Sequence, residues 1–260
     1  MQDAPDEVRA AIRAGDWDGP TASLAAGFAQ TNLVALPAAD AFEFLRFCVA
    51  NPGPCPVVEV TEPGAYEPPI SAPGADLRTD LPRYRVHVDG EVVDEPTDVR
   101  DVWREDLVAF LIGCSFTFER ALLGAGLPVR HIEQGTNVPM YTTALATHPA
   151  GRFSGPLVVS MRPMTPRQAI RATEITARFT NAHGAPVHIG DPHELGIADL
   201  ADPQFGDPVQ INAGETPVFW ACGVTPQAVA AASRPSLMIT HAPGHMFITD
   251  RADDEFSATV

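Results

Sequence analysis

Prolines spread along the whole chain constrain its fold more than any other sequence feature. They account for 26 of the 260 residues, twice the usual share of about 5%, and they form no low-complexity block. Proline lacks a backbone N–H and interrupts helix interiors, so this spacing favours many short elements joined by stiff turns over a helical bundle or coiled coil. The hydrophobic share of 45% and the charged share of 19% are typical of a folded globular protein.

The charged residues exclude several classes of function. All 17 members of the lysine-plus-arginine count are arginines, and 33 acidic residues bring the net charge to −16. Without lysine the chain cannot hold pyridoxal phosphate through an internal Schiff base, and it cannot bind a nucleotide through a Walker lysine. So negative a surface also disfavours nucleic acid and anionic membranes as partners.

The ends and the cysteines point to a cytoplasmic protein without a membrane partner. The N-terminal segment is acidic and lacks the basic start and apolar stretch of a signal peptide. The longest apolar run, near 107–116, is half as long as the roughly 20 residues that a membrane helix needs. The four cysteines show no C-x-x-C spacing, so we expect free thiols and neither a disulfide framework nor a zinc site.

Apolar spacing and turn residues predict the secondary structure. Helices are expected over 6–15, 21–30, 40–50, 98–124, 165–183 and 225–233, and the middle of the 98–124 helix is apolar all round. Strands are expected over 55–60, 127–133, 156–161, 187–190, 218–222 and 237–240, and a central Asp-Gly pair predicts a hairpin over 84–92.

This order of elements predicts an α/β fold. Strands separated by helices favour α/β layers with parallel pairing at least in part, and two βαβ units are expected, over 156–190 and 218–240. The length and the hairpin favour two subdomains. We expect a main α/β domain from 1–125 plus 205–260 and a smaller α/β subdomain over 126–204.

Three groups of polar residues lie where strands are expected to end, and loops at such places commonly bind ligands. The first group contains Arg130, His131, Glu133, Asn137 and Tyr141 within twelve residues. So many hydrogen-bonding side chains exceed what a surface loop requires, which indicates a binding role. The alternative is a solvated turn in which Arg130 pairs with Glu133.

The second group contains His188, Asp191 and His193. Imidazole and carboxylate suit divalent cations, but Gly190 and Pro192 put this segment into a turn and no fourth ligand is fixed by the spacing. We therefore expect no metal, and we predict a metal-free site role for His188 or Asp191. The alternative is that Asp191 caps the turn through its own backbone.

The third group contains His241 and His245, four residues apart. Pro243 and Gly244 between them preclude the helix that a zinc-protease motif requires. A loop that turns back between two strands could still direct both imidazoles into one cleft, where a neutral imidazole can act as a general base or acid. The alternative is two partly buried histidines that are hydrogen-bonded to the backbone.

Cys222 and Thr225 complete the candidate residues at the end of the 218–222 strand. The N-terminus of the following helix is expected to favour a thiolate at Cys222, although no Cys–His nucleophile signature surrounds it. Arginines can bind a carboxylate in two-pronged fashion, and Arg162 is one candidate for this role. On so acidic a chain, a surface ion pair is the alternative for any arginine.

Long segments of the chain resemble the D-glutamate cyclase family, whose small bacterial members carry a provisional hydro-lyase label. The similar segments are ADLRTDLPRYRV, DLVAFLIGCSFTFE, PVRHIEQGTNVPMY, GPLVVSMRP, PVHIGDPHELGI, PVFWACGVTPQ and ITHAPGHMFITD, and they span about 27–250. The resemblance implies a three-layer α/β sandwich with a smaller two-layer α/β subdomain, and a carbon–oxygen lyase. The activity associated with the family is the reversible conversion of D-glutamate to 5-oxo-D-proline and water. It belongs to a much longer animal mitochondrial member with an additional C-terminal domain.

That chemistry assigns hypothetical roles to the three groups. Cyclisation needs a base, an acid for the departing oxygen, a cation for the α-carboxylate and a group that holds the developing oxyanion. The candidates are His131, His188, His241 or His245 as base, Glu133 or Tyr141 as acid, Arg130 and Arg162 as cations, and Asn137 or Thr225 at the oxyanion.

Our hypothesis is therefore a cofactor-free carbon–oxygen lyase that acts on a small acidic metabolite, with D-glutamate as one candidate. One alternative is a non-catalytic binding protein for a small carboxylate metabolite. Another is a dehydratase that acts on a hydroxy acid. A homodimer is left open. The hypothesis depends on residues 131, 188 and 241 surrounding one common hollow.

Overall fold

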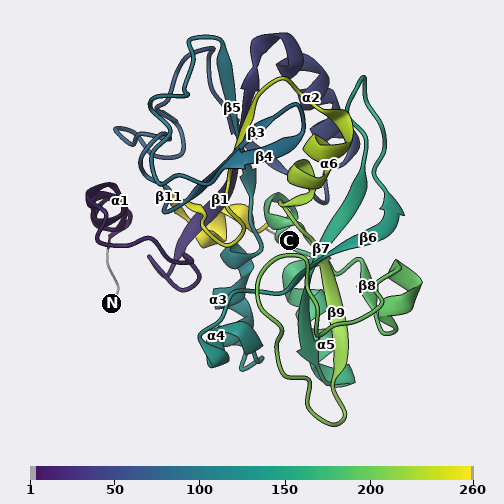
Figure 1. Ribbon diagram of the computed structural model, residues 1–260. Helices are drawn as coiled ribbons and strands as arrows, with labels where there is room; N and C mark the ends of the chain where they lie inside the picture. Colours follow the sequence, from purple (N-terminus) through teal and green to yellow (C-terminus); the bar gives the residue numbers. More distant parts are fainter. Residues whose placement is uncertain (1–3, 259–260) are drawn as a thin grey trace.

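A computed structural model describes residues 4–258 and places them in two antiparallel sheets with helices packed against them (Figure 1). The helices are α1 (Pro5–Ala14), α2 (Ala38–Ala50), α3 (Phe116–Gly124), α4 (Arg130–Gln134), α5 (Pro166–Thr176) and α6 (Thr225–Ser233), with short 3₁₀ helices η1 (Thr180–Ala182), η2 (Pro192–Leu195) and η3 (Asp253–Phe256). The strands are β1 (Phe28–Pro37), β2 (Val57–Val60), β3 (Tyr84–Val88), β4 (Glu91–Asp94), β5 (Leu107–Gly113), β6 (Met140–Ala146), β7 (Pro156–Met164), β8 (His188–Ile189), β9 (Thr216–Ala221), β10 (Met238–His241) and β11 (Phe247–Ala252).

The first sheet is built around β1. Its order is β2-β5-β1-β10-β3-β4, and β11 also pairs with β1. The β1–β5 pairing runs from Thr31 opposite Gly113 to Pro37 opposite Leu107, so both strands lie in the middle of the sheet. Nine of the ten β1 residues are buried because both faces of the sheet are covered.

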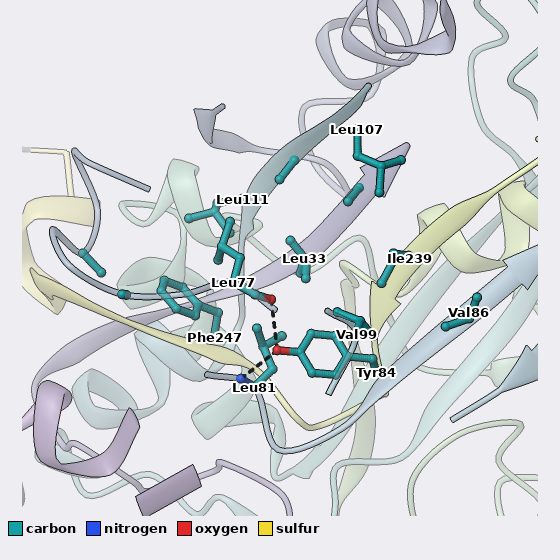
Figure 2. Packing of buried hydrophobic residues seen from close by; sticks show 14 of the residues in the cluster. Leu33, Leu77, Leu81, Tyr84, Val86, Val99, Leu107, Leu111, Ile239 and Phe247 are labelled. Atoms are coloured by element: carbon teal, nitrogen blue, oxygen red, sulfur yellow. Dashed lines mark hydrogen bonds between the residues drawn. The ribbon is translucent and has the colours of Figure 1, made fainter. Parts of the chain in front are cut away.

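Different structures cover the two faces of this sheet. Helices α2 and α6 pack on one face, where Phe44, Phe47 and Val229 join the core. A loop containing Leu77 and Leu81 packs on the other face (Figure 2). There the Tyr84 hydroxyl donates to Leu77 O at 2.9 Å and accepts from Leu81 N at 3.2 Å, which ties the loop to β3.

The second sheet has the order β6-β7-β9-β8 and lies in the lower half of the view in Figure 1. Strands β7 and β8 each run antiparallel to β9, so they are parallel to one another with β9 inserted between them. Helix α5 connects them, which makes this a split βαβ unit. Its apolar residues join those of α3 and α5 in one core cluster that includes Trp220 and Phe118.

The α/β class and several elements are confirmed. Helices form close to the expected 6–15, 40–50 and 225–233 segments, and the hairpin turns at Asp89 and Gly90, both with positive φ. The 165–183 helix begins as expected: the Thr165 hydroxyl accepts from Gln168 N, while Gln168 reaches back to Thr165 N. That helix ends at Thr176, earlier than predicted.

Three predicted elements are wrong. The 98–124 segment is not one helix, because Leu107–Gly113 forms β5 and only Phe116–Gly124 is helical. A strand covered on both faces is apolar all round, just as a buried helix is, so periodicity does not separate the two. The 127–133 segment holds the short helix α4 rather than a strand, and 21–30 turns into β1 rather than forming a helix.

The predicted parallel pairing is also wrong, because every described strand pair is antiparallel. Strands β9 and β10, joined by α6, lie in different sheets, so 218–240 is not a βαβ unit within one sheet. The second sheet takes in β9, beyond the expected 126–204, and the division into subdomains stays a prediction. None of the helices within residues 4–258 is both long and apolar enough to cross a membrane.

Candidate active site

The first and third polar groups meet at Asn137. Its Nδ2 donates to Pro243 O at 3.1 Å, and its backbone N donates to Asp207 Oδ2 at 2.9 Å. Gly244 has a φ of +84°, and a Cβ added there would overlap the Asn137 amide group. The 241–245 turn therefore needs glycine both for its conformation and for its contact with the 130–141 segment.

A buried ion cluster joins α3, α4 and β7. Glu119 Oε1 lies 3.0 Å from Arg162 Nε, accepts a second hydrogen bond from Arg162 Nη2, and lies 3.2 Å from His131 Nε2. The three side chains are 4% (Glu119), 0% (Arg162) and 1% (His131) exposed. Two helices and a strand thus meet at one carboxylate.

Arg162 makes four hydrogen bonds that hold this cluster. Its Nη2 also donates to Ser115 Oγ at 3.0 Å and its Nη1 to Ser160 Oγ at 3.2 Å. The guanidinium lies over the rings of Phe118 and Trp220, each 5.3 Å away. Four of its five N–H donors already bind Glu119 and two hydroxyl groups, so Arg162 holds Glu119 in this structure, and its role in binding a substrate carboxylate stays a prediction.

Glu119 is an anion in this environment. Burial by itself raises the pKa of its carboxyl, but the charges of His131 and Arg162 outweigh burial and lower the pKa below its ordinary value. Oxygen Oε1 takes all the contacts with Arg162 and His131, and no hydrogen bond within residues 4–258 uses Oε2. The His131 ring is stacked on Phe116, with 6.0 Å between the ring centres.

Glu119 lines a pocket of about 110 Å³. We call it the Gln30 pocket and define it by Gln30, Phe116, Glu119, Arg120, Ile132 and Asp253, together with residues 23–28. A neighbouring pocket of about 290 Å³ shares Gly27, Arg120 and Asp253 with it. Arg120 and Asp253 therefore border both spaces.

The Gln30 pocket contains polar groups without partners. Gln30 Oε1 and Asp253 Oδ1 are buried and make no hydrogen bond with residues 4–258. Arg120 is exposed and forms no hydrogen bond or ion pair with the described part of the chain. A Cβ on Gly27 would lie 2.8 Å from Arg120 Nη1, so the glycine leaves room for the guanidinium. Acceptors and one unpaired cation in a small space suit a molecule that carries both N–H donors and a carboxylate.

Asp253 differs from Glu119 although both border the same pocket. Burial raises the pKa of the Asp253 carboxyl to about 6, since it outweighs the opposing effect of the Arg120 charge. Asp253 therefore exchanges its proton close to neutral pH, whereas Glu119 stays ionised.

The histidines of the third group contact backbone. His241 is fully buried on β10, pairs with Tyr84 in the sheet, and its Nδ1 lies 3.3 Å from Leu33 O. Burial lowers its pKa to about 3. His245 Nδ1 lies 3.1 Å from Pro243 O, and burial also lowers its pKa. This is the alternative interpretation of the pair, and neither imidazole lines the Gln30 pocket.

The second group lies on the β8 edge of the other sheet. His188 Nε2 lies 2.9 Å from Asp191 O, and Asp191 Oδ1 accepts from His193 N at 2.9 Å, which caps η2. No hydrogen bond or ion pair of the described residues links His188 to His131 or His241. Within residues 4–258, no group of three His, Cys, Asp or Glu residues is arranged to hold a metal ion.

Arg130 pairs with Glu133 as in the alternative interpretation, but the turn is not solvated at Arg130, whose side chain is 11% exposed. Arg130 Nε lies 3.1 Å from Glu133 Oε2, and its Nη2 lies 2.5 Å from Glu215 Oε1. Neither residue lines the Gln30 pocket. The Arg130 guanidinium is already paired with two glutamates. Its role in binding a substrate carboxylate stays a prediction.

Three further candidate residues are buried in the core, namely Cys222, Thr225 and Tyr141. Burial raises the pKa of the Cys222 thiol to about 11, so the expected thiolate is wrong: the loss of hydration outweighs the helix N-terminus. The Thr225 hydroxyl donates to Cys222 O at 2.7 Å. The Tyr141 hydroxyl donates to Leu200 O at 2.8 Å, and its ring packs edge-on against Phe219.

Sequence reasoning missed four residues of the Gln30 pocket, namely Gln30, Glu119, Arg120 and Asp253. A signal existed for Glu119 and Arg120, because they interrupt the apolar run over 107–123. A charged side chain in such a run must either reach solvent or find a partner. Arg120 reaches solvent, and Glu119 pairs with Arg162. Gln30 and Asp253 lie in segments that carried no such contrast.

Comparisons with known proteins agree on one family. The model of the D-glutamate cyclase family matches residues 108–250, which include Glu119, His131 and Arg162. A relative from Stutzerimonas stutzeri is 60% identical over 252 residues, covering 97% of this chain and 95% of its own length. One from Bordetella pertussis is 62% identical over 255 residues, covering 98% and 92%. One from Geobacillus kaustophilus is 60% identical over 249 residues, covering 96% and 95%. All three carry the name "Putative hydro-lyase".

Proposed function

The chain belongs to the D-glutamate cyclase family, and on that premise we propose that it is a carbon–oxygen lyase of the hydro-lyase type acting on a small acidic metabolite. The observation that carries the proposal is the Gln30 pocket, in which the Glu119 anion is held by Arg162 and His131 beside the unpaired cation of Arg120. For the substrate we propose D-glutamate, converted reversibly to 5-oxo-D-proline and water.

The charges of the pocket support an amino acid with a carboxylate. An ammonium group would be attracted to Glu119 and could donate to Gln30 Oε1, which has no other donor. A carboxylate would be attracted to Arg120, whose planar guanidinium can bind both carboxylate oxygens. The pocket is small, and Glu119 and Arg120 place opposite charges along its lining. These features orient a small ligand.

His131 and Arg162 contribute through Glu119. Arg162 donates two hydrogen bonds to Oε1 and His131 Nε2 lies 3.2 Å from the same oxygen, so Oε2 stays available to the pocket. Holding a charged group in place before the substrate arrives lowers the cost of reorganisation during reaction. We propose that His131 and Arg162 are positioning residues.

The test uses wild-type protein with D-glutamate, L-glutamate and 5-oxo-D-proline in water enriched in ¹⁸O, with products identified by chiral chromatography and mass spectrometry. Opening of 5-oxo-D-proline should place ¹⁸O in the γ-carboxylate, because a C–O bond forms in that direction. Glu119→Gln should lower turnover at least about 10²-fold, the scale of a lost preorganised electrostatic contact. Glu174→Gln, in an exposed ion pair on α5, serves as the matched control and should keep wild-type turnover.

Each alternative has its own outcome. Thermal stabilisation by these acids without any turnover would favour the non-catalytic binding protein. An ultraviolet-absorbing unsaturated product from a hydroxy acid would favour the dehydratase. If these acids produce no turnover and no thermal stabilisation, the proposal is contradicted.

A further inference from the structure

Asp253 is a second buried carboxyl in the Gln30 pocket, and the proposed function leaves it without a role. It begins η3 directly after β11, and its backbone N donates to Gly27 O at 3.0 Å. The residue is 8% exposed, and its Oδ1 has no hydrogen-bond partner within residues 4–258. A buried oxygen without a partner is costly in a folded protein, so it needs an explanation.

The charges around Asp253 come from two elements. Arg120 approaches from α3, Asp254 follows in the chain, and Glu119 lines the same pocket from α3. Burial outweighs the Arg120 charge and raises the pKa of Asp253 to about 6, with Asp254 acting in the same direction. The two pocket carboxyls are thereby separated: Glu119 stays ionised while Asp253 can hold or release a proton. A pair of carboxyls whose environments separate their pKa values is a recurring arrangement for acid and base roles.

We infer that Asp253 is the catalytic residue that carries protons between the substrate nitrogen and the departing oxygen, an inference that rests on the proposed function. In the cyclisation the nitrogen of D-glutamate attacks its γ-carboxyl carbon, so a C–N bond forms and a C–O bond breaks. The ammonium loses two protons in becoming the lactam N–H, and the oxygen that leaves gains two in becoming water. The Asp253 carboxylate accepts each proton and passes it on, so it ends in its starting state and no other reactant is needed.

The position of Asp253 suits this role. It borders both the Gln30 pocket and the neighbouring pocket of about 290 Å³, so the released water has a space to enter beside the carboxyl. Glu119 is unsuited to the same task because its lowered pKa makes it a weak base.

The experiment compares Asp253→Asn with Asp16→Asn. Asp16 is an exposed aspartate that lines neither pocket, so its variant makes the same change of charge away from the site. Asp253→Asn should lower kcat at least about 10²-fold and remove the limb of the pH–rate profile near pH 6, while the Kd for 5-oxo-D-proline changes by less than about threefold. Asp16→Asn should keep both the rate and the limb. A merely structural role for Asp253 would not remove the pH limb.

The outcomes separate this inference from the proposed function. If the wild type converts neither D-glutamate nor 5-oxo-D-proline, both are overturned. If the wild type is active and Asp253→Asn retains its rate and its pH limb, only the Asp253 inference is overturned. Should Asp253→Asn fail to fold, judged by near-ultraviolet circular dichroism, Asp253→Glu replaces it. That variant should retain a pH limb displaced from the wild-type position, and an undisplaced limb would overturn the inference.

Discussion

Glu119 Oε1 lies 3.2 Å from His131 Nε2 at a place where both side chains are almost completely buried. Arg162 binds the same oxygen, so one carboxylate neutralises a buried guanidinium and orients an imidazole. Removing one member of such a cluster leaves the others charged or unpaired in the interior, where water does not compensate them. The cluster therefore has consequences for folding as well as for the proposed reaction.

Glu119→Gln should destabilise the protein by about 3–5 kcal/mol, the usual cost of breaking a buried ion pair from one side. The measurement is the free energy of unfolding in urea at pH 7. Glu174→Gln, which breaks the exposed pair with Arg171, should cost under about 1 kcal/mol because solvent screens that pair. Equal losses in the two variants would show that the Glu119 cluster is not a buried charge centre.

Stability should fall with acidification between about pH 6.5 and pH 4. Burial lowers the pKa of His241 to about 3 and that of His87 to about 4, from 6.5 in the unfolded chain. Between the folded and unfolded pKa values of these histidines, the unfolded state binds more protons than the folded state, so acid favours unfolding. The stabilisation from keeping the two histidines neutral is complete only above about pH 6.5. His241→Gln should reduce the slope of unfolding free energy against pH by about 1.4 kcal/mol per pH unit between pH 4 and 6. An unchanged slope would contradict the buried, neutral His241.

Gly244→Ala should be more damaging than Gly74→Ala, although the two glycines have nearly the same φ, +84° and +81°. A Cβ at residue 74 meets nothing within 4 Å, so that variant reports only backbone strain of about 1–2 kcal/mol. At residue 244 the new Cβ overlaps the Asn137 amide, which adds about 1–3 kcal/mol of steric strain. Chemical denaturation of both variants measures the difference, and no difference would mean that Asn137 moves aside freely.

Arg120→Met should weaken binding of 5-oxo-D-proline by about 10- to 100-fold, the range for one lost hydrogen bond to a charged group. Isothermal titration calorimetry measures the Kd. Arg46→Met, on the exposed side of α2 and outside the Gln30 pocket, is the control and should bind as the wild type does. Comparable Kd values for the two variants would place the carboxylate elsewhere.

The sequence predicted best the elements whose signals are local. The Thr165 cap, the Asp89-Gly90 turn and the α2 helix were predicted because each depends on residues within one or two turns of chain. The helix predicted over β5 is wrong because an apolar run over 107–113 indicates only that the segment is buried. Whether it is a strand depends on β1 and β2 pairing on either side of it.

The candidate site divides in the same way. The sequence singles out His131 and Arg162, yet their common partner Glu119 lies in the segment that the apolar pattern predicts as a core helix. Asp253, over a hundred residues further along, reaches the same pocket only because β11 pairs with β1 and brings η3 to Gly27. Composition and local spacing by themselves determined the short elements, the acidic surface and the excluded cofactor chemistry. The tertiary structure alone decided which charges are buried together, because desolvation and charge pairing depend on what packs around a side chain and not on its neighbours in sequence.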